Sequence, residues 1–265
     1  MALTPEALIS RVQVNIPFPF LGQGYLELFL DRGLNPEIGL DANSLSNFQR
    51  RDFQRMARAF HQTRRRLTLH APFQDLLPGA LDELILYSSR RRLGQAFRLL
   101  PVFKPVTIVC HLGFEAKLYQ GDRGNWLERS AATWKEFAAL AATHGVTVML
   151  ENVYEPDPDL FVELLTLVNA PNLQVCLDVG HLQAFGGGDF DHWLHTLWPV
   201  IGQPDPAHRP ESKLEAAYHK ADKAIQQIVD RHARNSGRSF VRQQSHRRTK
   251  TAQRRLPRAN RRSAL

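Results

Sequence analysis

The chain has 265 residues, 43% of them hydrophobic, a length that suits one large domain such as an α/β barrel. It contains no run of eighteen uncharged apolar residues, and its first residues lack the pattern of a signal peptide, so we expect a cytoplasmic protein without a membrane span. Its two cysteines, Cys110 and Cys176, fall inside predicted strands, which indicates buried thiols rather than a disulfide framework.

The net charge of +8 is unevenly distributed along the chain. Residues 231–265 contain twelve Lys or Arg and no Asp or Glu. Residues 1–230 contain the other 22 basic residues and all 26 acidic residues, a net charge of −4. Binding to nucleic acid relies on Lys and Arg that face phosphates. We therefore expect any such binding to involve the basic residues 231–265 and not residues 1–230 (the body).

Up to about residue 202, the hydrophobic pattern alternates between strands and helices. Two strands are predicted over 11–18 and 36–40, and four further apolar runs end at residues 70, 111, 151 and 178. Helices are predicted over 25–31, 52–63, 82–99, 126–143, 159–168 and 191–200, and 115–125 is predicted to be a polar loop. Predicted core positions on three of the helices are Phe53, Met56, Ala57, Phe60, Leu84, Leu93, Phe97, Leu100, Trp134, Phe137, Leu140 and Ala141.

The character of the sequence changes after residue 203. Pro204 and Pro206 interrupt regular structure, residues 211–234 have the pattern of an amphipathic helix, and residues 235–265 have a disordered composition. We therefore divide the chain into a partial barrel domain (1–203), a helical extension (204–234) and a basic tail (235–265). The predicted fold is an α/β barrel of the (β/α)8 TIM-barrel type, incomplete because six βα units stand where a closed barrel has eight. Unpaired first and sixth strands favour homo-oligomers.

Four predicted strands end on a side chain that can bind a metal ion: His70, His111, Glu151 and Asp178, with His181 three residues further on. The carboxyl ends of parallel strands meet at one rim, so we expect these side chains to converge there. Neutral imidazoles and carboxylates bind divalent ions such as Zn, Mn, Co or Mg. Any one His could instead be a hydrogen-bonded structural residue. Burying the whole set without a metal ion would be costly, which favours a metal site.

Smaller signals accompany these residues. Asn152 follows Glu151 and could bind a substrate hydroxyl or orient the carboxylate, with a turn role as the alternative. Gly180 would let the chain turn sharply after the sixth strand and aim His181 at the rim. Glu37 and Asp41, on or after the second strand, are interpreted as solvated loop acids, with support of the ligands from behind as the alternative. The three glycines at 186–188 lack the residues of a phosphate-binding loop and are interpreted as a flexible link.

Four segments in this order and spacing resemble the xylose-isomerase-like barrel superfamily, which includes sugar phosphate isomerases/epimerases and type IV apurinic endonucleases. The segments are LHAPF at 69–73, HLG at 111–113, LEN at 150–152 and CLDVGH at 176–181, and the likeness covers roughly residues 11–202. Members of the superfamily carry a His-x-His-x-Asp/Asn seventh strand and an acidic residue on the eighth strand. This chain shows no counterpart of either, so we expect a family member truncated or disrupted after about residue 203.

The resemblance implies a divalent-metal-dependent isomerase or epimerase acting on a small sugar or sugar phosphate. Glu151 would be both metal ligand and proton shuttle, Asp178 a ligand, and His181 a catalytic contact to substrate or metal. His70 and His111 would be ligands or substrate contacts at the rim. Besides the group that Glu151 would supply, superfamily members take a second catalytic base from the eighth strand. Loss of the last two strands would remove this base, so impaired activity is expected.

Two other functions stay open. His70 and His111 favour a zinc-dependent hydrolase of abasic-site DNA, whereas the net charge of −4 in residues 1–230 argues against it. The third possibility is a non-catalytic barrel remnant whose basic tail binds nucleic acid or an acidic partner.

Overall fold

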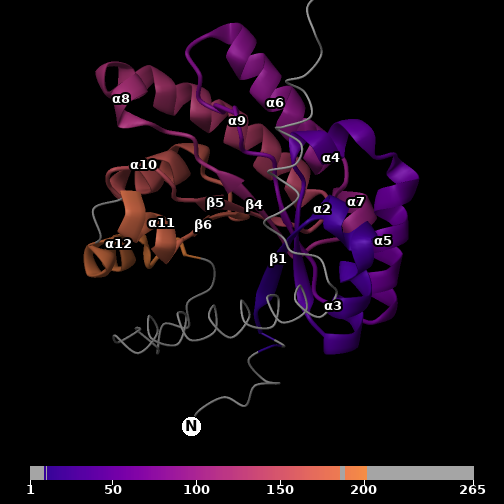
Figure 1. Ribbon diagram of the computed structural model, residues 1–265. Helices are drawn as coiled ribbons and strands as arrows, with labels where there is room; N and C mark the ends of the chain where they lie inside the picture. The colour runs from indigo at the N-terminus through magenta and orange to yellow at the C-terminus, as the bar shows by residue number, and fades with distance from the viewer. Residues whose placement is uncertain (1–8, 10, 186–188, 202–265) are drawn as a thin grey trace, which may run out of the picture. The chain divides into compact units, whose positions relative to one another are not determined.

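A computed structural model describes residues 9, 11–185 and 189–201, and Figure 1 shows their arrangement. The predicted helical extension, the basic tail and the glycine link at 186–188 lie outside these residues. Among the described helices, none has the length and apolar character needed to cross a membrane.

Six parallel strands form one sheet, in the same order as along the chain. They are β1 (Gln13–Pro17), β2 (Asn35–Gly39), β3 (Thr68–His70), β4 (Thr107–His111), β5 (Thr147–Glu151) and β6 (Leu173–Cys176). The sequential parallel order is that of consecutive βα units in a TIM-barrel sheet and confirms the predicted fold class. The sixth strand ends at Cys176, two residues before the predicted end at Asp178.

Helical segments follow the strands and lie around the sheet in Figure 1. They are α2 (Phe18–Phe20), η1 (Leu21–Tyr25), α3 (Leu26–Arg32), α4 (Ala42–Asn47), α5 (Arg50–Gln62), α6 (Glu83–Phe97), α7 (Leu100–Phe103), α8 (Ala116–Tyr119), η2 (Gln120–Asp122), α9 (Arg123–Ala142), α10 (Asp159–Val168), α11 (Val179–Phe185) and α12 (Phe190–Leu197).

The segment 115–125 is not the predicted loop, because it contains α8, η2 and the start of α9. Tyr119 is buried and its ring packs against Phe114 and Trp126. This packing favours a helical turn in a segment whose composition is polar.

Local sequence determines where several helices begin and end. The Asp82 carboxylate accepts hydrogen bonds from the backbone N–H groups of Leu84 and Ile85 and so begins α6. Gly33 ends α3 with a φ of 64°, a left-handed conformation that glycine adopts without strain. On α5 the four predicted core residues are all buried.

Two predicted core residues are exposed instead. Leu84 is 77% exposed because it lies at the first turn of α6, out of phase with the buried face that runs through Leu86, Leu93 and Phe97. Leu140 on α9 is 38% exposed, whereas its neighbour Ala141 is buried.

The two faces of the sheet differ in character. One set of alternating residues, including Ile38, Leu69, Ile108, Val148 and Val175, is fully buried. The other set contains many polar side chains: Asn15, Glu37, Thr68, Thr107, Thr147 and Gln174. The apolar runs of the sequence therefore do not produce strands that are apolar on both faces. By their positions in β3 and β5, His70 and Glu151 belong to the second set, so their side chains lie on the more polar face of the sheet.

Among the described residues, β1 pairs with β2 alone, whereas β6 has a second neighbour beyond β5. Ile201 forms a parallel bridge to Val175, and the backbone N–H of Val175 donates to the carbonyl of Val200 at 3.1 Å. The chain after α12 thus returns to the edge of β6, where a seventh parallel strand would begin.

Candidate metal centre

Glu151 lies at the centre of the predicted group of ligands. It is the last residue of β5, is 7% exposed, and is paired in the sheet with His111 at the end of β4. Its Oε2 atom lies 3.2 Å from Nε2 of His70 and 3.7 Å from Nε2 of His111. Its Oε1 atom lies 3.2 Å from Nδ1 of His181. The structure therefore brings these side chains together at the carboxyl ends of β3, β4 and β5.

Two triads share this carboxylate. His70, His111 and Glu151 form one, and Glu151, Asp178 and His181 form the other. In each triad the potential ligand atoms lie within 4.8 Å of one another. All five predicted ligand positions therefore belong to one continuous cluster, with Glu151 between its two halves.

The tautomer of His70 bears on whether the cluster suits a cation. Its Nδ1 atom lies 2.9 Å from the carbonyl oxygen of Ala71, which can only accept, so Nδ1 carries the hydrogen. In the neutral ring, Nε2 then presents a lone pair to the Glu151 oxygen. Two lone pairs facing each other require a positive charge between them. No Lys or Arg of the described chain pairs with Glu151, so a proton or a metal ion has to supply that charge.

Acid–base properties agree with this arrangement. Burial favours the neutral ring of His70, but the hydrogen bond and charge of Glu151 together outweigh it and raise the pKa of His70. Burial, with repulsion from His70 and His181, lowers the pKa of His111 to about 3. His111 is therefore neutral near pH 7, the form in which imidazole binds metals. The donor set fits a divalent cation.

Asn152 holds the chain next to this cluster. Its Oδ1 accepts from the backbone N–H of Asp178 at 2.7 Å, and its Nδ2 donates to the carbonyl of the same residue at 3.0 Å. The backbone carbonyl of Asn152 lies 3.0 Å from Nδ1 of His181. Asn152 thus positions two predicted ligands, and its predicted contact with substrate stays a prediction.

The segment after β6 differs from the sharp turn expected at Gly180. The chain enters α11 directly at Val179, and Gly180 is not among the residues with positive φ. The backbone N–H of His181 donates to Oδ1 of Asp178 at 2.7 Å. A Cβ atom at Gly180 would lie 3.1 Å from that oxygen, so glycine leaves space for the Asp178 carboxylate. The helix, and not a turn, directs His181 toward Glu151.

Glu37 is not the solvated loop acid that the sequence suggested. It lies within β2, beside Asn15 of β1 in the register, and accepts a hydrogen bond from Asn15 Nδ2 at 2.9 Å. Burial raises the pKa of Glu37, with further increases from the charges of Glu151 and Asp178. Its alternating position on β2 could have indicated this. Asp41 is exposed as expected and caps α4 through the Ser44 N–H.

Sequence reasoning missed two further residues near the cluster. The Phe73 ring stacks on His111 with centroids 4.2 Å apart and an interplanar angle of 22°. Glu155 is 1% exposed and accepts hydrogen bonds from the backbone N–H groups of Val153, at 2.6 Å, and Phe114, at 3.3 Å. It joins the loops after β4 and β5. Phe73 belongs to the LHAPF segment that carries the family resemblance, which was the available signal for it, and none existed for Glu155.

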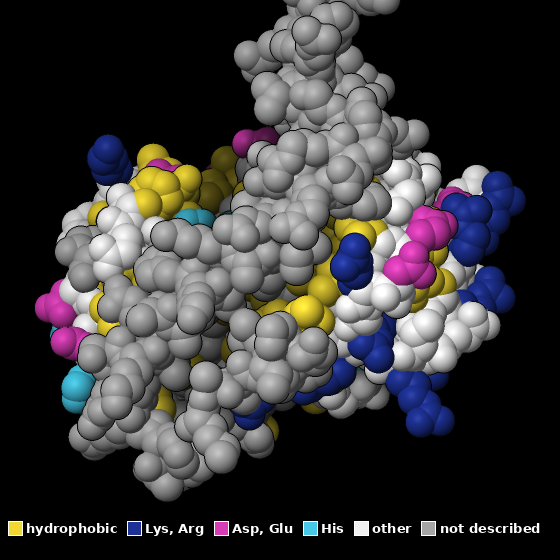
Figure 2. Space-filling view, turned by 60° about the horizontal axis from the view of Figure 1, so that its bottom comes forward, with side chains coloured by type: hydrophobic (Ala, Val, Ile, Leu, Met, Phe, Trp, Pro, Cys, Tyr) yellow, Lys and Arg dark blue, Asp and Glu magenta, His cyan; other side chains and the backbone are white. Residues whose placement is uncertain are grey.

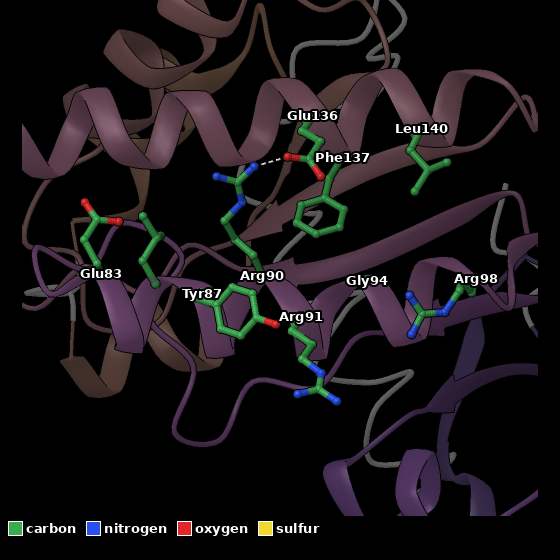
Figure 3. A pocket seen from close by; sticks show the side chains of 10 residues that line it. Glu83, Tyr87, Arg90, Arg91, Gly94, Arg98, Glu136, Phe137 and Leu140 are labelled. Carbon is green, nitrogen blue, oxygen red and sulfur yellow. Dashed lines mark hydrogen bonds and ion pairs between the residues drawn. The ribbon is translucent and has the colours of Figure 1, made fainter.

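A groove of about 550 Å³ lies elsewhere, between α6 and α9 (Figure 3). An ion pair between Arg90 and Glu136 bridges its two helices, and the exposed Tyr87 borders it. It contains none of the predicted ligands. The outer helices, rather than the strand ends, form this surface, so we do not assign the chemistry to it.

Comparison with known proteins relates the chain to one family. Residues 21–238 match the family described as "Xylose isomerase-like TIM barrel", a range that extends past the likeness expected over 11–202. The uncharacterized protein MJ1311 of Methanocaldococcus jannaschii is 26% identical over 130 residues. That alignment covers 45% of this chain and 43% of the relative, so the chain aligns with less than half of that protein.

Solved structures share the fold at low sequence identity. A D-tagatose 3-epimerase-like protein superimposes with a TM-score of 0.59 at 16% identity, covering 72% of this chain and 73% of the other. The TTHB071 protein of Thermus thermophilus, soaked with ZnCl2, gives 0.59 at 24% identity, covering 69% and 73%. A D-psicose 3-epimerase of Clostridium cellulolyticum with D-tagatose gives 0.58 at 17% identity, covering 72% and 71%. These likenesses establish the fold.

Proposed function

The chain belongs to the xylose isomerase-like TIM barrel family, and on that premise we propose that it is a divalent-metal-dependent enzyme that isomerises or epimerises a small sugar. The observation that carries the proposal is the Glu151 carboxylate, with His70 and His111 facing one oxygen and His181 facing the other. The epimerases among the structural neighbours support a sugar as the substrate class.

Each residue has a role in this proposal. His70, His111, Glu151 and Asp178 would hold the ion. A divalent ion in this place would act as a Lewis acid that stabilises negative charge on neighbouring sugar oxygens. Glu151 would take a proton from the carbon next to the sugar carbonyl and return it. His181, with its Nδ1 held by the carbonyl of Asn152, presents Nε2 as the atom that contacts a substrate oxygen or the ion.

The substitution Glu151→Gln tests this function because it keeps the side-chain volume and removes the charge. We expect bound metal to fall and turnover of a panel of aldoses, ketoses and their phosphates to drop by about 100-fold or more. Elemental analysis and product detection by chromatography measure the two effects. Glu163→Gln, which removes an exposed acid paired with Arg123, is the matched control and should change neither. Unchanged metal content and turnover in Glu151→Gln would contradict the proposal.

One observation favours a second candidate, a zinc-dependent hydrolase of abasic-site DNA. The His70–His111–Glu151 triad is present in addition to the Glu151–Asp178–His181 triad, so the cluster has donors for more than one ion. Against it, residues 1–230 carry a net charge of −4. On the face shown in Figure 2, Lys and Arg side chains lie in separate places with acidic side chains beside several of them. More than one metal ion per chain, with cleavage of an abasic-site duplex, would favour the hydrolase over the isomerase.

A further inference from the structure

A cavity of about 290 Å³ lies beside the metal centre, at the carboxyl ends of β1, β2 and β3. Its lining includes Asn15, Gly39, Asp41, His70 and Phe73. The volume is near the lower end of the range found for pockets that bind small molecules. Because His70 belongs to both the cavity and the metal cluster, a ligand that reacts at Glu151 can extend into this space.

Phe73 forms an aromatic wall of the cavity. It is 45% exposed, its ring stacks on His111, and the His70 ring meets it edge-on with centroids 5.4 Å apart at 71°. Single exposed apolar residues are common on protein surfaces and need no explanation. Phe73 differs from these because two imidazoles fix its ring beside a cavity. An ordered ring of this kind is suited to stacking against another planar group.

The position of Phe73 indicates which part of a ligand it would contact. The His70 and His111 rings touch Phe73 on one side and Glu151 on the other. A group that covers Phe73 is therefore separated by an imidazole layer from the carboxylate at which a sugar would react. It is a substituent of the sugar and not the reacting carbon.

Charge narrows the chemistry of that substituent. Among the residues that the structure describes, the cavity lining contains Asp41, whose carboxylate also accepts the Ser44 N–H, and no Lys or Arg. Any positive charge at His70 is balanced by the Glu151 carboxylate that faces it. A phosphate beside Phe73 would therefore find no free guanidinium or ammonium group among these residues and would be repelled by the charge of Asp41, which disfavours sugar phosphates at this position. Uncharged groups meet no such repulsion.

We propose that the cavity bordered by Phe73 is a second subsite that binds a planar aromatic or heteroaromatic group attached to an uncharged sugar. The substrate class is then a glycoside or nucleoside whose sugar also keeps a carbonyl group next to the carbon that Glu151 would deprotonate, and not an unsubstituted sugar or a sugar phosphate. Ordinary glycosides and nucleosides, which lack that carbonyl, serve as unreactive analogues for measuring binding. This proposal rests on the proposed sugar-binding function and deepens it.

Binding of matched ligands to the full-length protein tests the subsite. Methyl and phenyl glycosides of the same sugars, together with nucleosides, are compared by titration calorimetry or ligand-detected NMR. We expect the phenyl glycosides or the nucleosides to bind about tenfold more tightly than the methyl glycosides, since stacking adds to the burial of apolar surface. Preference for phenyl glycosides identifies an aryl group, and preference for nucleosides identifies a base.

Substitutions at Phe73 connect this preference to the ring. Phe73→Leu keeps an apolar side chain without a planar face and should abolish the preference, whereas Phe73→Tyr should retain it. Both variants should keep the metal content of the unmodified protein. Tyr87→Ala removes a tyrosine that is 63% exposed on α6, beside the outer groove, and is the control for loss of an exposed aromatic ring.

The outcomes separate this inference from the proposed function. Equal binding of methyl glycosides, phenyl glycosides and nucleosides, tighter binding of sugar phosphates, or binding of no glycoside or nucleoside would each overturn the subsite. If free sugars are still turned over in a Glu151-dependent way, the proposed function stands without the subsite. A preference that survives in Phe73→Leu would also overturn the inference, because the ring would not be its cause.

Discussion

At the scale of single residues, the protonation of His70 links the metal centre to pH. The hydrogen bond to Ala71 fixes the Nδ1 hydrogen, so the position between Nε2 and Glu151 is available to either a proton or a metal ion. The pKa of His70 is raised above its ordinary value of 6.5. The two cations therefore compete for one position near neutral pH.

This competition predicts that metal binding releases a proton. Affinity should increase as pH rises through the raised pKa of His70 and level off above it, with release of up to about one proton per ion. Calorimetry in buffers of different ionisation enthalpy measures the release. His61→Gln is the control, because His61 contacts the carbonyl of Phe103 and not the cluster. Affinity that stays constant from about pH 6 to 9 would contradict the prediction.

Glu155 predicts a second pH dependence, this time of stability. Burial raises the pKa of Glu155 from 4.5 to about 7, although backbone N–H groups lower it in part. Between about pH 4.5 and 7, Glu155 is therefore protonated in the folded state and ionised in the unfolded state. The free energy of unfolding should therefore fall as pH rises from about 4.5 to about 7, by an amount on the order of 3 kcal/mol, and stay level above.

The substitution Glu155→Gln should remove this slope, since the amide does not titrate. Chemical denaturation at several pH values measures it. Glu163→Gln is again the matched control, because the Arg123 ion pair lowers the pKa of that exposed carboxyl. If Glu155→Gln keeps the same slope between about pH 4.5 and 7, another group causes it.

The sequence predicted well which of these side chains lie together, and it predicted their surroundings poorly. His70, His111 and Glu151 stand at the ends of apolar runs, and parallel strands bring such ends together whatever the details of packing. Glu37 and Glu155 could not be recognised in the same way, because whether a carboxyl is solvated or buried depends on residues far away in the chain. Phe73 was overlooked because one aromatic residue after a strand has no periodicity.

At the scale of elements, the residue directly before α11, Asp178, is itself a predicted ligand. Asp178 accepts the backbone N–H of His181, and Asn152 at the end of β5 fixes the backbone of Asp178 from the neighbouring strand. Beyond the last register pair of β5 and β6, Glu151 and Cys176, a side-chain amide therefore continues the connection between the two chain segments.

We predict that Asn152→Ala weakens metal binding as well as the fold. It leaves the N–H of Asp178 without its partner, at a cost of about 2 kcal/mol in the free energy of unfolding, whereas the C=O of Asp178 still accepts the backbone N–H of Leu182. Asn172→Ala is a matched control, since the Asn172 amide donates to the carbonyls of Ala138 and Val146 away from the cluster. Denaturation and metal titration of both variants measure the effects. Equal metal affinity in the two variants would show that Asn152 acts on stability alone.

Element boundaries followed the sequence closely where a cap or an apolar run marked them. The predicted helix at 159–168 is α10, and three of the four predicted ligand strands end at the expected residue. The errors arose where tertiary packing decides, as at Tyr119 in α8 and at Leu84 on the first turn of α6. A single leucine in the first turn of a helix does not show which face of the helix is buried, because that turn lies partly outside the core.

At the scale of the whole chain, the distribution of charge separates two kinds of interaction. Residues 1–230 carry a net charge of −4 and contain the candidate metal centre, whereas residues 231–265 contain twelve basic residues and no acidic ones. Binding to a polyanion would therefore depend on the last 35 residues, and binding of a metal ion would not.

Deleting residues 235–265 should therefore remove any affinity for nucleic acid. For the full chain we expect binding to a labelled DNA duplex to weaken at least tenfold between about 50 and 200 mM salt. Fluorescence anisotropy over a salt series measures this, and unchanged metal content in the deleted chain shows that its fold is intact. Salt-insensitive binding, or binding that persists after the deletion, would place the contact in the body.

The two oxygens of Asp178 give the first turn of α11 a further property. One oxygen accepts the backbone N–H of His181 and holds that turn, and the other lies 3.8 Å from Nδ1 of the same residue. In the proposed function this carboxylate therefore serves both local folding and ion binding. If an ion binds only when this carboxylate is in place, binding and ordering of the turn are thermodynamically linked. The free energy by which the ion stabilises the turn then equals the free energy by which the ordered turn strengthens ion binding. Amide hydrogen exchange along α11 would then report how fully the protein is loaded, even where no substrate is known.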